Sequence, residues 1–389
     1  MRPERYRYLL PRKTSLIMVT VHEVKTAKDK REFLNFPIRL YKDCPYFVPP
    51  LFMDEKKIFS PNYFYYDTCE ASYFLAERDG KTVGRISGIL QKAHNEKTGE
   101  KRVRFTRFDS IDDQEVASAL FEAVENWAKL KGMDTVCGPL GFSDLEREGL
   151  LIEGFDQLST YEEQYNYAYY QKLIENCGYE KEVDWVERRI SWPKTPDEKF
   201  IRVSEMVLKK HGLKFGTAKN LNEFLKKYAD QFFDLLDRTY VDIYGTVPFT
   251  DGMKKSMIDN FKLIMSLKYV AVIVDENDKV VCMAICFPSM SEPLVKSRGR
   301  LTPAAIYGIL KSKRHPKVID LGLIGVEPEY ALKGVSSAVF AYMMKSMKDE
   351  NIEYAETNLN LEDNYSIQNQ WRRFDNVLHK RRRAFIKHV

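Results

Sequence analysis

The sequence lacks the cysteine patterns that mark zinc centres and disulfide scaffolds. None of its six cysteines form a pair separated by two residues, and the closest pair, Cys282 and Cys286, lies in the apolar run 280–287. Alternation along a strand places both thiols on one face, where we expect buried, reduced side chains. The sequence therefore predicts no metal site and no disulfide framework.

Long apolar runs and an excess of one charge are missing as well. No stretch approaches the roughly 18 consecutive apolar residues of a transmembrane helix, and the basic segment 1–17 has no apolar core of the signal-peptide kind. The 61 Lys and Arg residues nearly balance the 56 Asp and Glu residues, for a formal net charge of +5. We therefore expect a cytoplasmic protein with a basic tail at 1–17 and no nucleic-acid partner.

What the chain does contain is enough apolar sequence for two domains. Its 389 residues are 44% hydrophobic and 13% aromatic, which suffices for a large core. The same order of predicted strands and helices occurs twice along the chain, and Pro193 and Pro196 separate the two copies. We expect one domain at 18–195 and a second at 196–389.

Hydrophobic periodicity predicts the elements of each copy. The first has expected strands at 19–24, 71–78, 82–91, 103–110, 134–138 and 183–192, and helices at 29–41, from 113 onward and at 167–177. The second has expected strands at 213–219, 269–275, 280–287, 318–326, 354–358 and 378–388, and helices at 221–240, 251–266, 336–350 and 364–374. The predicted fold class is α/β, α+β by some schemes, with a mixed, mostly antiparallel sheet flanked by helices in each domain.

Segment 324–337 is the most informative part of the sequence, because a short loop there joins a strand to an amphipathic helix. Backbone N–H groups at a helix start bind anions, and a glycine lets the backbone approach them closely. We expect this loop to hold a pyrophosphate; a tight turn without a ligand is the alternative. The expected binding residues are Ile324, Gly325, Val326, Lys333, Gly334, Val335, Ser336 and Ser337.

This segment resembles the acyl-CoA loop of the GNAT superfamily of N-acyltransferases, which reads Gln/Arg-x-x-Gly-x-Gly/Ala. Gly334 matches the first glycine, whereas Ala331 and Ser336 depart from the pattern. The resemblance implies acyl-CoA as co-substrate, with either an acetyl or a longer acyl group. It also implies that Asn364 contacts the CoA arm. Trp371 replaces the tyrosine that often protonates the leaving thiolate, so the candidate acid is Tyr365, with protonation by solvent as the alternative.

An amine must lose a proton before it attacks a thioester, and a carboxylate beside the cleft can accept that proton. Glu356 and Glu362 are the candidates in the second half, where helix capping and surface solvation are the alternative roles. Asp109 is a candidate from the first half, with a surface or capping role as its alternative. The loop at 110–115 is acidic and lacks glycine, so we expect the first half to repel CoA and form a wall of the substrate site.

Over nearly its whole length the sequence resembles a bacterial family of tandem GNAT-like proteins that includes ceramide-synthase-like acyltransferases. The resemblance lies in segments 46–51, 112–116, 138–142, 149–156, 165–170 and 361–364. It implies direct transfer of an acyl group from CoA to a primary amine, and extends to a long acyl chain and a sphingoid-like base. Two alternatives stay open: an inactive acyl-CoA or lipid-binding protein, and a tRNA-dependent aminoacyl transferase.

Segment 296–314 combines an apolar helix face with basic flanks. Ala304, Ala305, Gly308 and Ile309 share that face, which predicts peripheral contact with the inner side of a membrane, or else a surface helix packed on its own domain. The basic run 380–383 lies in a predicted strand, so its side chains alternate between two faces. For this run we expect solvation or contact with the CoA phosphates.

Overall fold

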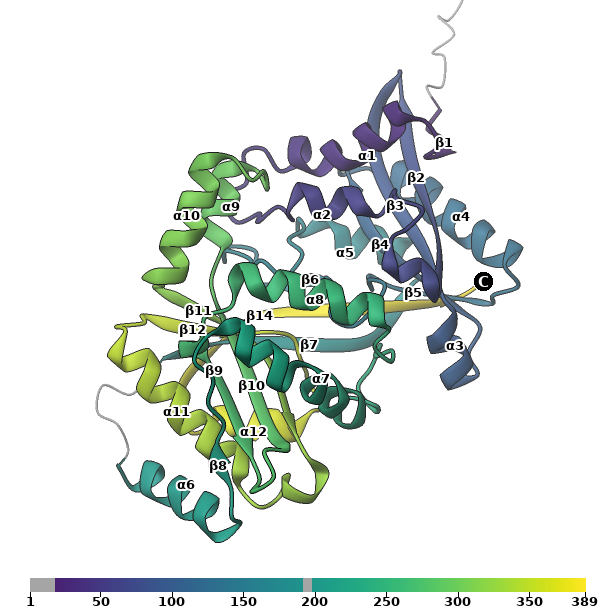
Figure 1. Cartoon of the computed structure of the whole chain (residues 1–389). Coiled ribbons are helices and arrows are strands. Elements are labelled where there is room, and N and C mark those ends of the chain that lie inside the picture. Colours follow the sequence, from purple (N-terminus) through teal and green to yellow (C-terminus); the bar gives the residue numbers. More distant parts are fainter. Residues whose placement is uncertain (1–17, 192–197) are drawn as a thin grey trace, which may run out of the picture.

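The computed structural model describes residues 18–191 and 198–389. The predicted tail at 1–17 and the predicted domain boundary near residue 195 lie outside these ranges, so both stay predictions. Figure 1 shows two lobes, with β7 (Glu180–Ser191) and β14 (Asp375–His388) running side by side across the middle.

The first half is a sheet with helices on both faces. Its elements are β1 (Thr20–Glu23), α1 (Ala27–Leu40), α2 (Phe52–Lys57), a 3-10 turn (Phe64–Asp67), β2 (Cys69–Arg78), β3 (Lys81–Gln91), α3 (Lys92–Thr98), β4 (Arg102–Ser110), α4 (Gln114–Leu130), β5 (Thr135–Gly138), β6 (Leu150–Glu153) and α5 (Tyr169–Asn176). A Cβ on Gly88 would meet Trp127 of α4 at 2.9 Å. Arg85 lies three residues before Gly88 in β3, so its side chain points to the other face, where it donates to the Phe33 carbonyl of α1. Helices α1 and α4 therefore cover opposite faces of the sheet.

The second half repeats this arrangement. Its elements are α6 (Glu198–Lys210), β8 (Lys214–Phe215), α7 (Leu221–Thr239), α8 (Asp251–Ile264), β9 (Val270–Val274), β10 (Val280–Pro288), α9 (Ser291–Ser297), α10 (Pro303–Arg314), β11 (Val318–Val326), α11 (Val335–Asp349), β12 (Tyr354–Thr357), β13 (Asn360–Leu361) and α12 (Tyr365–Trp371), with 3-10 turns at Leu267–Tyr269 and Pro328–Tyr330. Met283 packs in one core cluster with Phe232 of α7, whereas Cys282 and Cys286 pack in another with Met343 of α11. The two thiols are buried and free on one face, as predicted.

The closing strands of the two halves are exchanged. β7, the last strand of the first half, pairs with β12 of the second, and β14 pairs with β5 of the first. β7 and β14 also pair with each other, which joins the strands of the described residues into one 14-stranded sheet. Neither half therefore completes its sheet with strands of its own sequence.

The exchange buries charge at the seam between the halves. Lys380 and Arg382 of β14 are fully buried. Lys380 Nζ lies 3.1 Å from Glu187 and 2.9 Å from Glu356, and Arg382 Nε lies 2.6 Å from Glu187. We expected these two cations to face solvent or CoA phosphates, and that expectation is wrong because β14 lies inside the sheet. The prediction that the side chains of this run alternate between two faces is confirmed, because Arg381 is part-exposed on the other face.

Candidate active site

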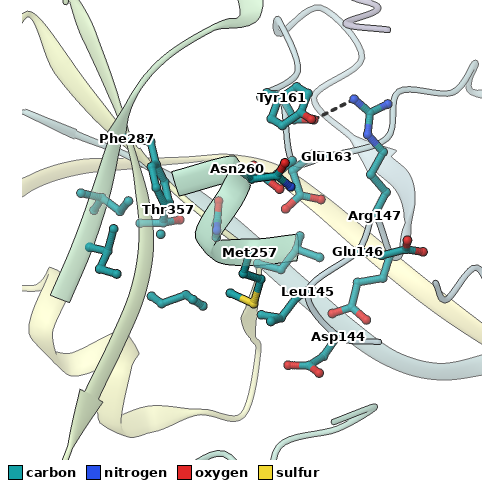
Figure 2. A pocket seen from close by; sticks show the side chains of 18 of the residues that line it. Asp144, Leu145, Glu146, Arg147, Tyr161, Glu163, Met257, Asn260, Phe287 and Thr357 are labelled. Carbon is teal, nitrogen blue, oxygen red and sulfur yellow. Dashed lines mark hydrogen bonds between the residues drawn. The ribbon is translucent and has the colours of Figure 1, made fainter. Parts of the chain in front are cut away.

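A cavity of about 740 Å³ lies between the two halves. The first half contributes α2, part of β4 and the loop segments 144–148 and 161–165; the second contributes α8, β10, β11, α11 and the chain after β12. Figure 2 shows Asp144, Glu146 and Glu163 on one side of this space and Met257 and Phe287 on the other. The cavity therefore has an acidic wall and a largely apolar wall.

The cavity enters the sheet where β11 and β12 separate. The two strands pair in parallel only over residues 318–321 and 354–357; the chain then turns to β13, which pairs with β7. The register between β10 and β11 also shifts, so that Gly322 has no partner in β10. A Cβ on Gly322 would lie 2.6 Å from the Phe287 ring. The glycine therefore permits the bulge beside the opening.

The start of α11 borders the same cavity through Ser336. Gly334 is the N-cap residue, with a φ of +77°, and among the described residues no side chain caps this helix. The matching helix of the first half, α4, has its N–H groups occupied by Asp113, which accepts from Glu115 and Val116 at 3.0 and 3.3 Å. The start of α11 thus has no side-chain cap of its own to compete with an anion, whereas an anion at α4 would meet a carboxylate.

Carboxyl groups dominate the first-half wall of the cavity. They are Asp54, Glu55, Asp109, Asp144, Glu146, Glu148, Glu162 and Glu163, beside the cations Lys57, Arg85, Arg107 and Arg147. Arg107 holds Glu55 through two contacts of 3.1 Å. Arg147 donates instead to the carbonyls of Val48 and Tyr161. Several of these acids therefore have no close cation among the described residues.

Burial shifts the proton affinity of these acids. It raises the pKa of Asp144 to about 6 and that of Glu162 to about 7. Burial also raises the pKa of Glu163 to about 8, against the opposing effect of Arg382. The pKa of Glu148 lies well above its usual value, first through burial and then through the neighbouring carboxyls. The wall thus contains groups that bind and release protons near neutral pH.

Glu163 connects the cavity to the buried ions of the seam. The residue is 3% exposed, and its Oε2 lies 3.6 Å from Arg382 Nε. This oxygen has no hydrogen-bond partner among the described residues. Because Glu187 fixes Arg382 at 2.6 Å, Arg382 in turn sets the position of Glu163, and one buried acceptor of Glu163 is left without a donor.

Comparison with known proteins identifies this architecture. None of the available protein-family models matches the chain. It is 27% identical over 376 residues to Protein YghO of Escherichia coli strain K12, and the alignment covers 93% of each chain. It is 26% identical over 340 residues to the bacterial ceramide synthase of Caulobacter vibrioides, which covers 85% of this chain and 86% of the relative.

Solved structures agree at the level of the fold. A tandem GNAT protein from the clavulanic acid biosynthesis pathway superimposes with a TM-score of 0.54 at 11% identity, covering 95% of this chain and 98% of that one. The chain has the tandem GNAT fold. A GCN5-related glucosamine N-acetyltransferase region of a fungal β-N-acetylglucosaminidase gives a TM-score of 0.56 at 12% identity, covering 96% of this chain and 38% of that one. The predicted fold and the resemblance to ceramide-synthase-like tandem GNAT proteins are therefore confirmed.

Within this tandem GNAT fold, four of the predicted CoA-binding residues line the cavity: Ile324, Val326, Ser336 and Asn364. Strand alternation turns Gly325 to the opposite face, where a Cβ would meet Leu235 at 3.0 Å. The loop residues Lys333 and Gly334 and the helix residues Val335 and Ser337 do not line it. Val335 is fully buried, and Lys333 lies over the Tyr330 ring. Asn364 caps α12 as expected.

The predicted catalytic residues are dispersed. Asp109 lines the cavity, but Arg85 and the Tyr41 hydroxyl bind its carboxylate at 2.8 and 2.9 Å. Glu356 is buried against Lys380 outside the cavity lining. Glu362 pairs with Lys181 and Arg381 on the surface, and Tyr365 is 71% exposed; neither lines the cavity.

A group that exchanges a proton with a bound amine has to reach the cavity, so residues in its lining are the stronger candidates. Sequence reasoning did not single out Glu162 and Glu163. Their only local signal is a pair of acids between the aromatic residues Tyr161 and Tyr165. That pattern equally describes a solvated loop, and the loop's position against the second half is a long-range property.

Proposed function

We propose that this protein is an acyl-CoA-dependent N-acyltransferase whose reaction takes place in the cavity between the two halves. One observation carries the proposal: a single cavity is bordered on one side by the uncapped start of α11 and on the other by carboxyl groups with pKa values near neutrality. The first feature suits a phosphate-bearing donor and the second an amine. The similarity to GNAT-fold proteins and to a ceramide synthase supports the same chemistry.

The donor binds from the second half in this proposal. The pyrophosphate of CoA lies against the N–H groups at the start of α11, next to Ser336. The thioester enters the opening between β11 and β12, beside Ile324 and Val326. Asn364 lies at the same opening. Backbone N–H groups there can stabilise the oxyanion that develops on the thioester carbonyl.

The acceptor binds from the first half. Its ammonium group lies among Asp144, Glu148, Glu162 and Glu163, which attract a cation whenever they are ionised. Ionised Glu163 takes one proton from the ammonium, and the free amine then attacks the thioester carbonyl. As the C–S bond breaks, the second proton leaves the nitrogen and protonates the CoA thiolate. The products are an amide and CoA.

The apolar wall supports a substrate with an alkyl chain. Met257, Phe261 and Ile264 of α8, with Phe287 and Met290, line the side of the cavity that faces the acids. A cavity of this volume lies within the usual range for sites that enclose most of a drug-sized ligand. We therefore propose a long-chain donor or a sphingoid-like amine as the preferred substrate.

Donor binding is tested by calorimetry with acetyl-CoA and palmitoyl-CoA on the full chain. Ser336→Glu places a negative charge at the expected pyrophosphate site, while the carboxylate still suits the helix N-terminus. The matched control is Lys345→Glu, an exposed position further along the same helix. We expect binding to be lost in the first variant and retained in the second. Absence of heat with both thioesters would overturn the proposal, and binding of charged tRNA in its place would favour the aminoacyl transferase.

Acceptor chemistry is tested by CoA release with a long-chain amino alcohol and with ethanolamine. In Glu163→Gln we expect the rate to fall by about 10² to 10⁴ and the rise of the rate with pH near 8 to disappear. Glu153→Gln, on an exposed carboxylate of β6 outside the cavity lining, is the control. Tight acyl-CoA binding without turnover of either amine would instead favour the inactive, lipid-binding alternative.

A further inference from the structure

The hairpin of α9 and α10 projects at one edge of the molecule, next to α2 (Figure 1). Ala305 and Ile309 of α10 are buried, and Ile309 packs with Leu294 of α9. A Cβ on Gly308 would meet Pro293 at 3.0 Å. These are residues of the face that we expected to meet a membrane. The alternative expectation, a surface helix packed on its own domain, holds for this face, because the fold uses it for packing on α9.

A second apolar face of α10 is left open. Ile306, Tyr307 and Leu310 are 46%, 70% and 48% exposed. Positions 306, 307 and 310 lie three and four residues apart along the helix, so the three side chains form one stripe. We call these three residues the α10 stripe. Exposed large apolar residues scattered singly need no explanation, but three on one face mark an interaction surface.

The surroundings of the α10 stripe are strongly basic. Between residues 291 and 317 the chain has seven Lys and Arg residues and one acidic residue, Glu292. Among the described residues, the ion pairs of this segment are limited to Lys296 with Glu292 and Lys317 with Glu353. Both pairs are surface pairs, so most of the positive charge is free to attract a negatively charged partner.

The hairpin also adjoins the cavity. Met290, the residue before α9, lines it, and Lys313 of α10 donates to the carbonyl of the cavity-lining Leu263 at 3.1 Å. At the other end of α9, the Gly299 carbonyl accepts from Phe52 N at 2.9 Å, and the Arg300 guanidinium lies over the Phe52 ring. The α10 stripe therefore belongs to a rigidly held element beside the cavity.

We infer that the α10 stripe docks on an anionic lipid bilayer, with the stripe in the interface and the surrounding cations against the lipid headgroups. An amphipathic helix with a basic border binds in this way without crossing the membrane. None of the helices in the described ranges is long and apolar enough to span a bilayer. A soluble protein partner would not require this concentration of positive charge around an apolar stripe.

The test is flotation of the purified full chain with vesicles of phosphatidylcholine, and with vesicles of equal parts phosphatidylcholine and phosphatidylglycerol. Vesicle binding is measured without acyl-CoA or amine. A negative result can therefore be distinguished from a failure of the proposed acyltransferase function. Tyr307→Glu removes the most exposed member of the stripe. Its control is Leu130→Glu at the 85%-exposed end of α4. A second variant combines Lys311→Glu and Arg314→Glu and so reverses two charges beside the stripe. Its control is a double variant in the first half that combines Lys81→Glu and Lys101→Glu.

We expect binding to the anionic vesicles only, weakening with added salt. Tyr307→Glu should abolish it, and the basic-residue variant should weaken it by about fivefold or more for each cation removed. Both control variants should bind like the original chain. Three results would overturn the inference: no flotation with anionic vesicles, equal flotation with neutral vesicles, or unchanged flotation of Tyr307→Glu. Retention of a protein from a lysate without vesicle binding would also count against the bilayer.

Discussion

Replacing Lys380 by methionine should destabilise the whole molecule, because this cation holds the exchanged strands together. The buried group contains two cations, Lys380 and Arg382, and two acids, Glu187 and Glu356. Although burial opposes ionisation, Arg382 and Lys380 hold the pKa of Glu187 at about 2. Burial raises the pKa of neighbouring Asp320 to about 8, so that group is mainly neutral. Lys380→Met therefore removes the closest cation from Glu356 and leaves it only the part-exposed Arg189, at 3.4 Å, among the described residues.

The size of the effect follows from the remaining contacts. Breaking a buried ion pair by removing one partner costs about 3–5 kcal/mol. After the substitution, Glu187 retains Arg382 at 2.6 Å and Glu356 retains Arg189 at 3.4 Å. We therefore expect the lower end, about 3 kcal/mol. Arg381→Met, one residue along β14 on the part-exposed face, should cost about 1 kcal/mol or less.

The assay is urea unfolding at pH 7, followed by tryptophan fluorescence and by far-UV circular dichroism. Because β7 and β14 belong to both halves, the two signals should show one common transition in the unaltered chain. The double variant Lys380→Met with Glu356→Gln also removes the acid that lost its closest cation, and should be less destabilised than the sum of its single changes. Equal losses in Lys380→Met and Arg381→Met would refute the reasoning, since the seam would then gain nothing from its buried charge balance.

Three further predictions test the site and its electrostatics. The raised pKa values of Glu162, Glu163 and Asp320 mean that the folded chain binds protons which the unfolded chain releases, so the free energy of unfolding should fall between about pH 4.5 and 8. Thermal midpoints across this range measure the fall, and a slope as steep in Asp320→Asn as in the original chain would exclude Asp320 as a contributor. Gly322→Val forces a Cβ against Phe287 and the Ile285 carbonyl, at 2.6 and 2.7 Å. It should cost about 1–3 kcal/mol and weaken acyl-CoA binding in calorimetry; unchanged binding would show that the bulge does not shape the donor site. Tyr365→Phe and Glu362→Gln should leave the rate of CoA release within about twofold, because neither side chain lines the cavity. A fall of about 10² or more in either variant would assign it an acid or base role.

Local chemistry determined most of the elements that the sequence predicts. The expected strand at 318–326 has those bounds in the structure, and the expected strands at 71–78 and 82–91 are β2 and β3, joined by a turn at Asp79-Gly80. The helix expected from residue 113 onward is α4, and Asp113 is its N-cap residue. Each of these features depends on neighbours within a few residues, through alternation, turn conformation or capping, and therefore leaves a local signal. Elements with a weak pattern, such as α2, α3 and α9, were not predicted.

The tertiary structure decided which of these elements meet. Alternation in 375–388 predicts a strand but not its partners, and pairing with both β5 and β7 turned Lys380 and Arg382 from expected surface cations into buried ones. In the same way, α10 has two apolar faces, and only its packing on α9 selects the one left exposed. Glu163 lines the cavity because the loop that contains it, in the first half, lies against the second half. Sequence periodicity records which side of an element is buried. It does not record which distant element buries it, because contacts between distant segments form only when the chain folds.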